Sequence, residues 1–183
     1  IESVSFNIKT LVEKTVRIIS LEALRKNIEV ETDIDYSLPD LVKGDPTRIQ
    51  QVLINLLKNS LKFTERGYIY TELSASKDGK FLLFKVTDSG IGIEKEKRQH
   101  LFQTYFQGDA SISRKYGGSG LGLAICRTLV TAMNGTISFE PNKYGGSIFS
   151  FTVPLVPEAE NSVPYCMLPV PSSTKILIAD ASV

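Results

Sequence analysis

The residues whose types and spacing best suit chemistry lie between Gly117 and Leu123, where Gly-Gly-Ser-Gly-Leu-Gly-Leu precedes an apolar helical pattern. Backbone N–H groups at a helix N-terminus attract anions, and the helix dipole favours a phosphate there. A P-loop would need Lys followed by Ser or Thr after its last glycine, and a dinucleotide fold would need parallel strand–helix–strand units. Neither pattern is present, so the segment predicts a phosphate site of another kind.

A second glycine cluster runs Asp-Ser-Gly-Ile-Gly-Ile over residues 88–93 and directly follows an expected strand. Glycines at this spacing permit a sharp backbone turn. Taken alone, such a turn serves structure more often than function, so its meaning depends on what lies beside it.

Polar side chains recur at regular spacing between Asp45 and Thr64. Asp45 followed by Pro46 is typical of a helix start, and apolar residues then recur with a helical period. A glutamine, two asparagines and a lysine follow at intervals of four, four and three residues: Gln51, Asn55, Asn59 and Lys62. This spacing places them along one face of the helix. Such a row is usually a solvated surface, but beside two glycine clusters it is a candidate binding face.

The other elements are predicted from apolar periodicity and turn residues. We expect further helices over residues 6–26, 95–103 and 117–133. We expect strands over residues 28–35, 68–76, 81–87, 136–140 and 147–155, a connection over 36–43 and a loop over 105–117. Helices grouped on one face of a mixed, mostly antiparallel sheet give an α+β fold, a two-layer α/β sandwich.

Composition excludes several classes of protein. The 183 residues include 21 basic and 20 acidic side chains, which indicates neither a nucleic-acid partner nor a membrane surface. Without a long apolar run or a signal-peptide pattern, the protein is expected to be soluble and cytoplasmic, although a longer parent could carry a membrane anchor. Cys126 and Cys166 are expected to be free thiols, and His100 a surface or packing residue.

The C-terminal part differs in composition from the rest. Five prolines between residues 154 and 171, mixed with serines and glutamates, predict an interdomain linker. Residues 175–180 form a short apolar run ending in an acid, which is typical of a buried first strand. We therefore expect a folded domain over 1–155, a linker over 156–174 and the truncated start of another domain over 175–183.

Four segments resemble, in order, the N, G1, F and G2 boxes of sensor histidine kinases: residues 55–64, 88–93, 101–106 and 118–123. Residues 146–151 resemble the closing strand of the same Bergerat-type ATP-binding domain, which belongs to the superfamily of gyrase, chaperone, histidine kinase and MutL ATPases. Four boxes in order are far more specific than one glycine motif. The linker and the segment after it resemble the approach to a receiver domain, as in hybrid histidine kinases.

The resemblance implies a site for ATP and Mg²⁺. Asn59 would bind Mg²⁺ and Asn55 would support the metal shell. Lys62 would meet phosphate, and with Asn55 it is expected to act in catalysis. Phe63 would cover the nucleotide, and Asp88 would accept a hydrogen bond from the adenine amine. The other nucleotide-binding positions implied are Gly90, Gly92, Gly118, Ser119, Gly120, Leu121, Gly122 and Ser147.

The residue at position 55 also separates related families. Gyrase B, MutL and the ninety-kilodalton heat-shock chaperone resemble this domain but place a glutamate general base where this chain has Asn55. A water nucleophile needs such a base, whereas an imidazole brings its own lone pair. The resemblance therefore implies transfer of the ATP γ-phosphoryl group to a histidine in the dimerisation domain of a homodimeric parent, and then to a receiver domain or response regulator. Two alternatives stay open: a degenerate nucleotide-binding docking module, and a serine kinase of the same fold.

Overall fold

The computed structural model describes residues 1–103 and 120–158. Its helices are α1 (Ile8–Arg25), α2 (Pro46–Phe63), α3 (Lys95–Arg98) and α5 (Gly122–Ala132). Its strands are β1 (Val4–Asn7), β2 (Ile28–Ile34), β3 (Leu41–Gly44), β4 (Gly67–Ala75), β5 (Phe81–Asp88), β6 (Ile137–Pro141) and β7 (Ser147–Pro154). The loop expected over 105–117, most of the predicted linker and the predicted strand over 175–180 lie outside the described residues.

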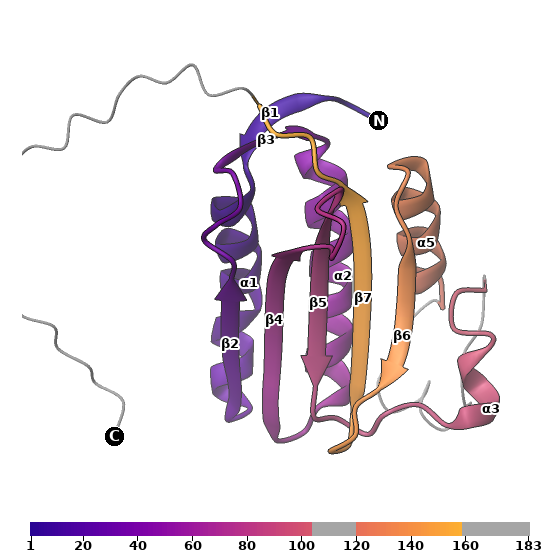
Figure 1. The fold of residues 1–183 in the computed structure, drawn as a ribbon. Helices are drawn as coiled ribbons and strands as arrows, with labels where there is room; N and C mark the ends of the chain where they lie inside the picture. Colours follow the sequence, from indigo (N-terminus) through magenta and orange to yellow (C-terminus); the bar gives the residue numbers. More distant parts are fainter. Residues whose placement is uncertain (104–119, 159–183) are drawn as a thin grey trace, which may run out of the picture.

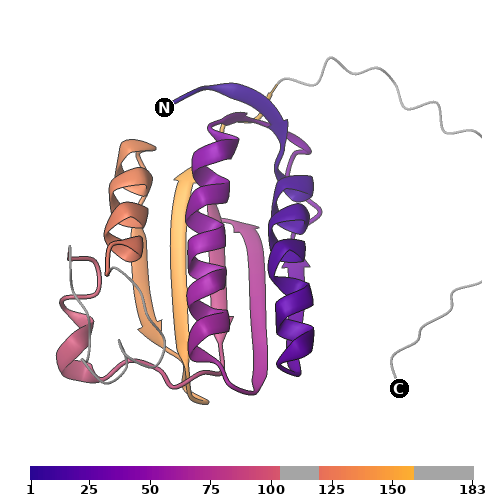
Figure 2. The same cartoon turned by 180° about the vertical axis from the view of Figure 1, so that it is seen from behind.

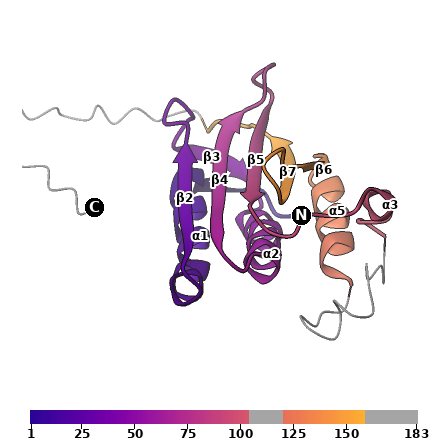
Figure 3. The same cartoon turned by 90° about the horizontal axis from the view of Figure 1, so that it is seen from below.

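Five strands form one sheet in the order β2-β4-β5-β7-β6 (Figure 1). β2 runs parallel to β4, and the other neighbouring strands are antiparallel. The three long helices α1, α2 and α5 cover the same face of this sheet (Figure 2), and the view from below separates the helical layer from the strands (Figure 3). The predicted two-layer α/β sandwich is confirmed.

The core lies between the helices and the inner face of the sheet. The apolar stripe of α2 is buried there through Ile49, Val52, Leu53, Leu56, Leu57 and Leu61. Opposite it, the rings of Phe84 on β5 and Phe151 on β7 stack with their centroids 4.4 Å apart. Burial of this stripe fixes the rotation of α2 and therefore the direction of its polar side chains.

The start of α2 confirms its sequence signature. Asp45 is the N-cap, and its carboxylate accepts a hydrogen bond from the N–H of Arg48 at 3.0 Å. Pro46 occupies the first turn, where its missing N–H costs nothing. Near the other end, the ammonium of Lys26 donates to the carbonyl of Leu61 at 2.8 Å, satisfying one of the last helical carbonyls.

The helix expected over residues 6–26 begins two residues later. Asn7 caps it by accepting a hydrogen bond from the N–H of Thr10 at 2.8 Å. Phe6 instead lies in β1, opposite Val42 of β3. The predicted stop at Asn27 is confirmed, since this residue has a left-handed φ of 54°.

The connection expected over residues 36–43 contains a strand that the sequence prediction missed. β3 pairs antiparallel with β1 on one side. On its other side, the N–H of Lys43 donates to the carbonyl of Val156, and the N–H of Glu158 donates to that of Leu41. Residues 156–158, past the expected boundary at 155, therefore pair with β3. A four-residue strand whose partners are distant in sequence has no local signal.

The helix expected over residues 95–103 is confined to Lys95–Arg98. The backbone continues in tight turns, with the N–H of His100 donating to the carbonyl of Lys97 and that of Gln103 to the carbonyl of His100. These are i to i−3 bonds, so the helical pattern tightens and ends. Within the described residues, no helix is both long enough and apolar enough to cross a membrane.

Candidate functional site

Asp88, the last residue of β5, is a buried carboxylate with only 3% of its surface exposed. One oxygen accepts hydrogen bonds from the N–H groups of Gly90 at 2.9 Å and Ser147 at 3.1 Å. The other accepts from the Ser60 hydroxyl at 3.2 Å. Burial raises the pKa of this carboxyl and outweighs the three hydrogen bonds, which act to lower it. A carboxylate has about four acceptor positions, so one remains for a further donor.

The turn after β5 folds tightly against the C-terminal end of α2. The N–H of Ile91 donates to the carbonyl of Phe63 at 3.2 Å. A Cβ atom added to Gly90 would lie 2.4 Å from that same carbonyl oxygen, so only glycine fits. Gly92 has a left-handed φ of 69°, which glycine adopts without strain. The two glycines therefore bring the backbone of the 88–93 turn directly to α2.

Sequence analysis missed two buried polar residues beside this turn. Thr64 is fully buried, and its hydroxyl has no hydrogen-bond partner among the described residues. It would lie 2.9 Å from a Cβ atom at Gly90, so this orphaned group sits against the turn. Asn142 donates through its amide to the carbonyl of Asp88 and to the hydroxyl of Tyr68, each at 3.1 Å. Thr64 adjoins the polar row in sequence, whereas nothing local indicates the role of Asn142.

The polar row of α2 reaches the same region, except for its first member. Gln51 is exposed and accepts a hydrogen bond from the Arg48 guanidinium at 2.9 Å, so it belongs to the helix surface. Asn55, Asn59 and Lys62 are half-buried. Burial lowers the pKa of the Lys62 ammonium, which lies 4.8 Å from the centre of the Phe63 ring. A partly desolvated ammonium next to amides suits an anionic ligand.

The first turn of α5 packs on the middle of this row. The amide nitrogen of Asn55 lies 3.0 Å from the sulfur of Cys126. Gly122, the first residue of α5, approaches the same amide so closely that a Cβ atom there would lie 2.8 Å from its oxygen. Gly120, with a φ of 69°, and Leu121 lead into this helix. Gly118 and Ser119 lie outside the described residues.

The structure thus brings most of the predicted site residues to one end of the molecule. Phe63, Asp88, Gly90 and Ser147 are joined by the contacts above, and Asn55 meets Gly122 across the α2–α5 boundary. Asn59 and Lys62 lie on the same helix between these two groups. Together they offer a buried acceptor, backbone N–H groups, amide oxygens and an ammonium, which suit a ligand with both a base and phosphates.

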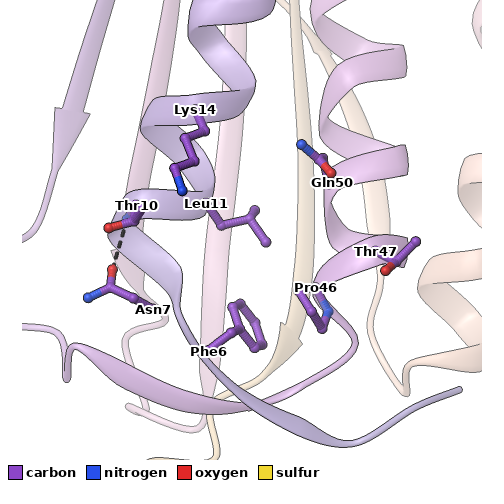
Figure 4. Close-up of a pocket in the computed structure, with 8 residues that line it drawn as sticks. All are labelled: Phe6, Asn7, Thr10, Leu11, Lys14, Pro46, Thr47 and Gln50. Carbon is purple, nitrogen blue, oxygen red and sulfur yellow. Dashed lines mark hydrogen bonds between the residues drawn. The ribbon is translucent and has the colours of Figure 1, made fainter.

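A hollow of about 410 Å³ lies elsewhere, between the N-terminal turns of α1 and α2 (Figure 4). Its lining combines apolar, hydroxyl and amide side chains with one lysine: Phe6, Asn7, Thr10, Leu11, Lys14, Pro46, Thr47 and Gln50. None of these was a predicted site residue. This hollow lies at the N-terminal end of α2, whereas Asp88 and its glycine turn lie at the C-terminal end.

Among the described residues there is no group of three or more His, Cys, Asp or Glu that could hold a metal ion. A divalent cation at this site would depend on amide oxygens, water and the ligand's own phosphates. Mg²⁺ commonly binds in this way, with few protein ligands, so the half-buried amides of Asn55 and Asn59 fit it.

Known proteins with similar sequences and folds indicate the family of this chain. Residues 44–157 match the family described as histidine kinase-, DNA gyrase B- and HSP90-like ATPase. The chain is 38% identical over 154 residues to the sensory/regulatory protein RpfC of Xanthomonas campestris, covering 82% of this chain and 21% of that protein. It is 39% identical over 158 residues to the signal transduction histidine-protein kinase BarA of Escherichia coli, covering 85% of this chain and 17% of that protein. The chain thus spans about a fifth of the length of these relatives.

Two solved structures are similar to the whole folded unit. Full-length ShkA in complex with AMPPNP is 31% identical with a TM-score of 0.76, covering 86% of this chain and 32% of that one. The nucleotide-free catalytic domain of the histidine kinase ThkA is 29% identical with a TM-score of 0.73, covering 86% of this chain and all of that one. The family match over residues 44–157, together with these similar structures, establishes that the chain belongs to the histidine kinase-, DNA gyrase B- and HSP90-like ATPase family.

Proposed function

We propose that this chain is the ATP-binding catalytic domain of a hybrid sensor histidine kinase, which transfers the γ-phosphoryl group of ATP to a histidine of a dimerisation domain. The observation that carries the proposal is Asp88, a buried carboxylate at a glycine turn with one acceptor position to spare. The exocyclic amine of adenine is a donor that could fill the remaining acceptor position of the Asp88 carboxylate. The relative BarA, a signal transduction histidine-protein kinase, supports the same conclusion.

The base would lie between Asp88 and the end of α2. Phe63 would cover it, and Gly90, Gly92 and Ser147 would bring the backbone to its edge. Thr64 adds an unpaired hydroxyl beside Gly90 that a ligand or a bound water can satisfy. A buried polar group without a partner costs stability, so binding here removes a penalty that the free protein carries.

The phosphates would lie along the row of α2 toward α5. Lys62 would neutralise phosphate charge, and the backbone of Gly118, Ser119, Gly120, Leu121 and Gly122 would donate N–H groups to it. Asn59 would hold Mg²⁺ through its amide oxygen, with Asn55 beside it. The metal ion, when bound, supplies charge neutralisation on the phosphates.

An amide at position 55 favours transfer to a histidine over hydrolysis. Asn55 cannot remove a proton from water, and its amide already donates to Cys126. The acceptor imidazole carries its own lone pair, so the domain only has to position the phosphates and exclude water. The acceptor histidine would come from a dimerisation domain of a homodimeric parent, and a receiver domain or response regulator would take the phosphoryl group next. An ATP-dependent domain of this kind would work in the cytoplasm.

The proposal is tested by mixing the domain with the separately produced dimerisation domain of its parent and ATP labelled at the γ-phosphate. We expect label on the dimerisation domain that is lost in acid and kept in alkali, as phosphohistidine requires. Acid-stable label would instead indicate a serine kinase. No label with wild-type domain that still binds ATP would indicate a nucleotide-dependent docking module. Asp88→Asn is the negative control in each case.

A further inference from the structure

Cys126 lies on the second turn of α5 and is almost completely buried, with 1% of its surface exposed. Its sulfur has two polar neighbours, both on α2. The side-chain amide of Asn55 donates to the sulfur at 3.0 Å, and the thiol donates to the backbone carbonyl of Val52 at 3.9 Å. The thiol therefore connects a backbone acceptor on one turn of α2 to a site residue on the next.

The direction of these two bonds decides which end of the Asn55 amide faces the sulfur. A thiol has one proton, and because the Val52 carbonyl can only accept, the thiol donates that proton to it. The sulfur can then only accept, so it selects the NH₂ end of the amide and leaves the carbonyl oxygen for another partner.

One turn before Cys126, the backbone of α5 also approaches this amide. A Cβ atom at Gly122 would lie 2.8 Å from the oxygen and 2.9 Å from the nitrogen of Asn55. The amide plane therefore lies against the backbone of the first turn of α5, where the glycine-rich segment joins the helix. The Asn55 side chain therefore contacts both the sulfur of Cys126 and the backbone at Gly122.

We propose that Cys126 is a positioning residue that orients the Asn55 amide so that its carbonyl oxygen is presented to the metal and phosphates. The role in metal binding rests on the proposed function, since it places Asn55 in the Mg²⁺ shell. The contact between Cys126 and Asn55 does not depend on the proposed function, because it is present in the protein without ligand. A residue that cannot accept a hydrogen bond at position 126 frees the amide to flip, and the NH₂ group would then repel the cation.

Two substitutions separate this role from packing. Cys126→Ser keeps a group that can donate to Val52 and accept from Asn55. Cys126→Val fills the buried volume but removes both functions; Cys126→Ala replaces it if the valine variant does not fold. Thr128→Val is the matched control, because Thr128 lies on the same helix, is exposed and bonds only within α5, to the carbonyl of Ala124.

The first measurement uses the protein without nucleotide. Nuclear magnetic resonance follows solvent exchange of the Asn55 side-chain NH₂ protons, assigned by their loss in Asn55→Ala. We expect exchange about two- to tenfold faster in Cys126→Val than in wild type, the range that one net hydrogen bond gives. Cys126→Ser and Thr128→Val should stay near wild type. Equal exchange in wild type and Cys126→Val would overturn the proposal, whatever the domain binds.

The second measurement compares ADP affinity with and without Mg²⁺. The gain in affinity that Mg²⁺ provides should fall about three- to tenfold in Cys126→Val and be largely rescued in Cys126→Ser, whereas Mg²⁺-free affinity should stay unchanged. An equal loss with and without Mg²⁺ would mean a packing role and contradict the proposal. If wild type binds no nucleotide, the proposed function fails and with it the metal role of Asn55, while the exchange experiment still decides whether Cys126 orients the amide.

Discussion

Two buried carboxylates beside α2 show how differently this fold treats the same chemical group. Asp45 at the start of α2 and Asp88 near its other end are 4% and 3% exposed, and both accept backbone N–H groups. Burial acts to raise the pKa of Asp45, but the N–H groups of Glu2 and Arg48 and the charge of Arg48 outweigh it, so that pKa is lowered. At Asp88 burial prevails over three hydrogen bonds, and the pKa is raised.

The difference separates a structural carboxylate from one suited to binding. The charge of Asp45 is compensated by the helix it caps. Among the described residues, Asp88 has hydrogen bonds but no cationic partner, and the orphaned hydroxyl of Thr64 lies against the same turn. A buried group with a shifted pKa is typical of binding sites. The hollow of about 410 Å³ lies at the Asp45 end, where the neighbouring carboxylate is satisfied by the N–H groups of Glu2 and Arg48.

The largest expected effect is that of Asp88→Asn on nucleotide binding. The amide replaces the last acceptor position with a donor, and loss of a charge-assisted hydrogen bond should weaken ADP binding about 10- to 100-fold. Stability should change by less than about 1 kcal/mol, since the cost of burying a charge is removed while the amide oxygen can still accept from Gly90 and Ser147. Displacement of a fluorescent ADP analogue and chemical denaturation measure the two quantities. Asp78→Asn, in the exposed hairpin, is the control.

Asp45→Ala should give the reverse pattern. Loss of the N-cap leaves the N–H groups of Glu2 and Arg48 without an acceptor and should lower the free energy of unfolding by about 1–2 kcal/mol. ADP affinity of the folded protein should change less than about twofold, because this end of α2 is remote from the site. The control is Asp40→Ala, which removes an exposed carboxylate that pairs with the Lys9 ammonium at 2.8 Å and does not cap α2. A tenfold loss of ADP affinity in Asp45→Ala would contradict the assignment of a structural role to Asp45 and a binding role to Asp88.

The pH dependence of stability should distinguish the two groups by sign. The folded pKa of Asp45 lies below its ordinary 3.8, so its stabilisation is complete above that value and is lost as pH falls through the lowered pKa. The folded pKa of Asp88 lies above 3.8, so its ionisation reduces stability as pH rises from 3.8 through the raised pKa. Unfolding free energies of Asp45→Asn and Asp88→Asn against pH should therefore diverge from wild type in opposite directions. Parallel curves would contradict the assignment.

The smallest expected effect is at Glu158, whose carboxylate meets the Ser5 hydroxyl and lies 3.8 Å from the ammonium of Lys43. Glu158→Gln should lower stability by less than about 1 kcal/mol, as for other exposed ion pairs. It should leave ADP affinity unchanged, in keeping with a structural role for this end of the molecule. Thermal unfolding in the presence and absence of ADP tests both expectations, and a smaller ADP-induced shift in the variant would link this end to the site.

Sequence predicted the parts of this fold that depend on local signals. Asp45, Pro46 and an apolar stripe were enough for α2, because a cap and a helical period lie within one segment. β3 was missed because its partners are β1 and residues 156–158. The same limit applies to the site. The boxes indicated Asp88 and Asn55 by resemblance, whereas the contacts of Asn142 and Cys126 join segments 54 and 71 residues apart and required the structure.

Titration calorimetry of the wild-type domain with ADP, with and without Mg²⁺, tests the central claim most directly. We predict saturable one-to-one binding that is stronger with Mg²⁺ and is weakened in Asp88→Asn but not in Asp45→Ala. Absence of binding at millimolar ADP, or equal loss in both variants, would contradict the assignment of the nucleotide site to the Asp88 end of α2.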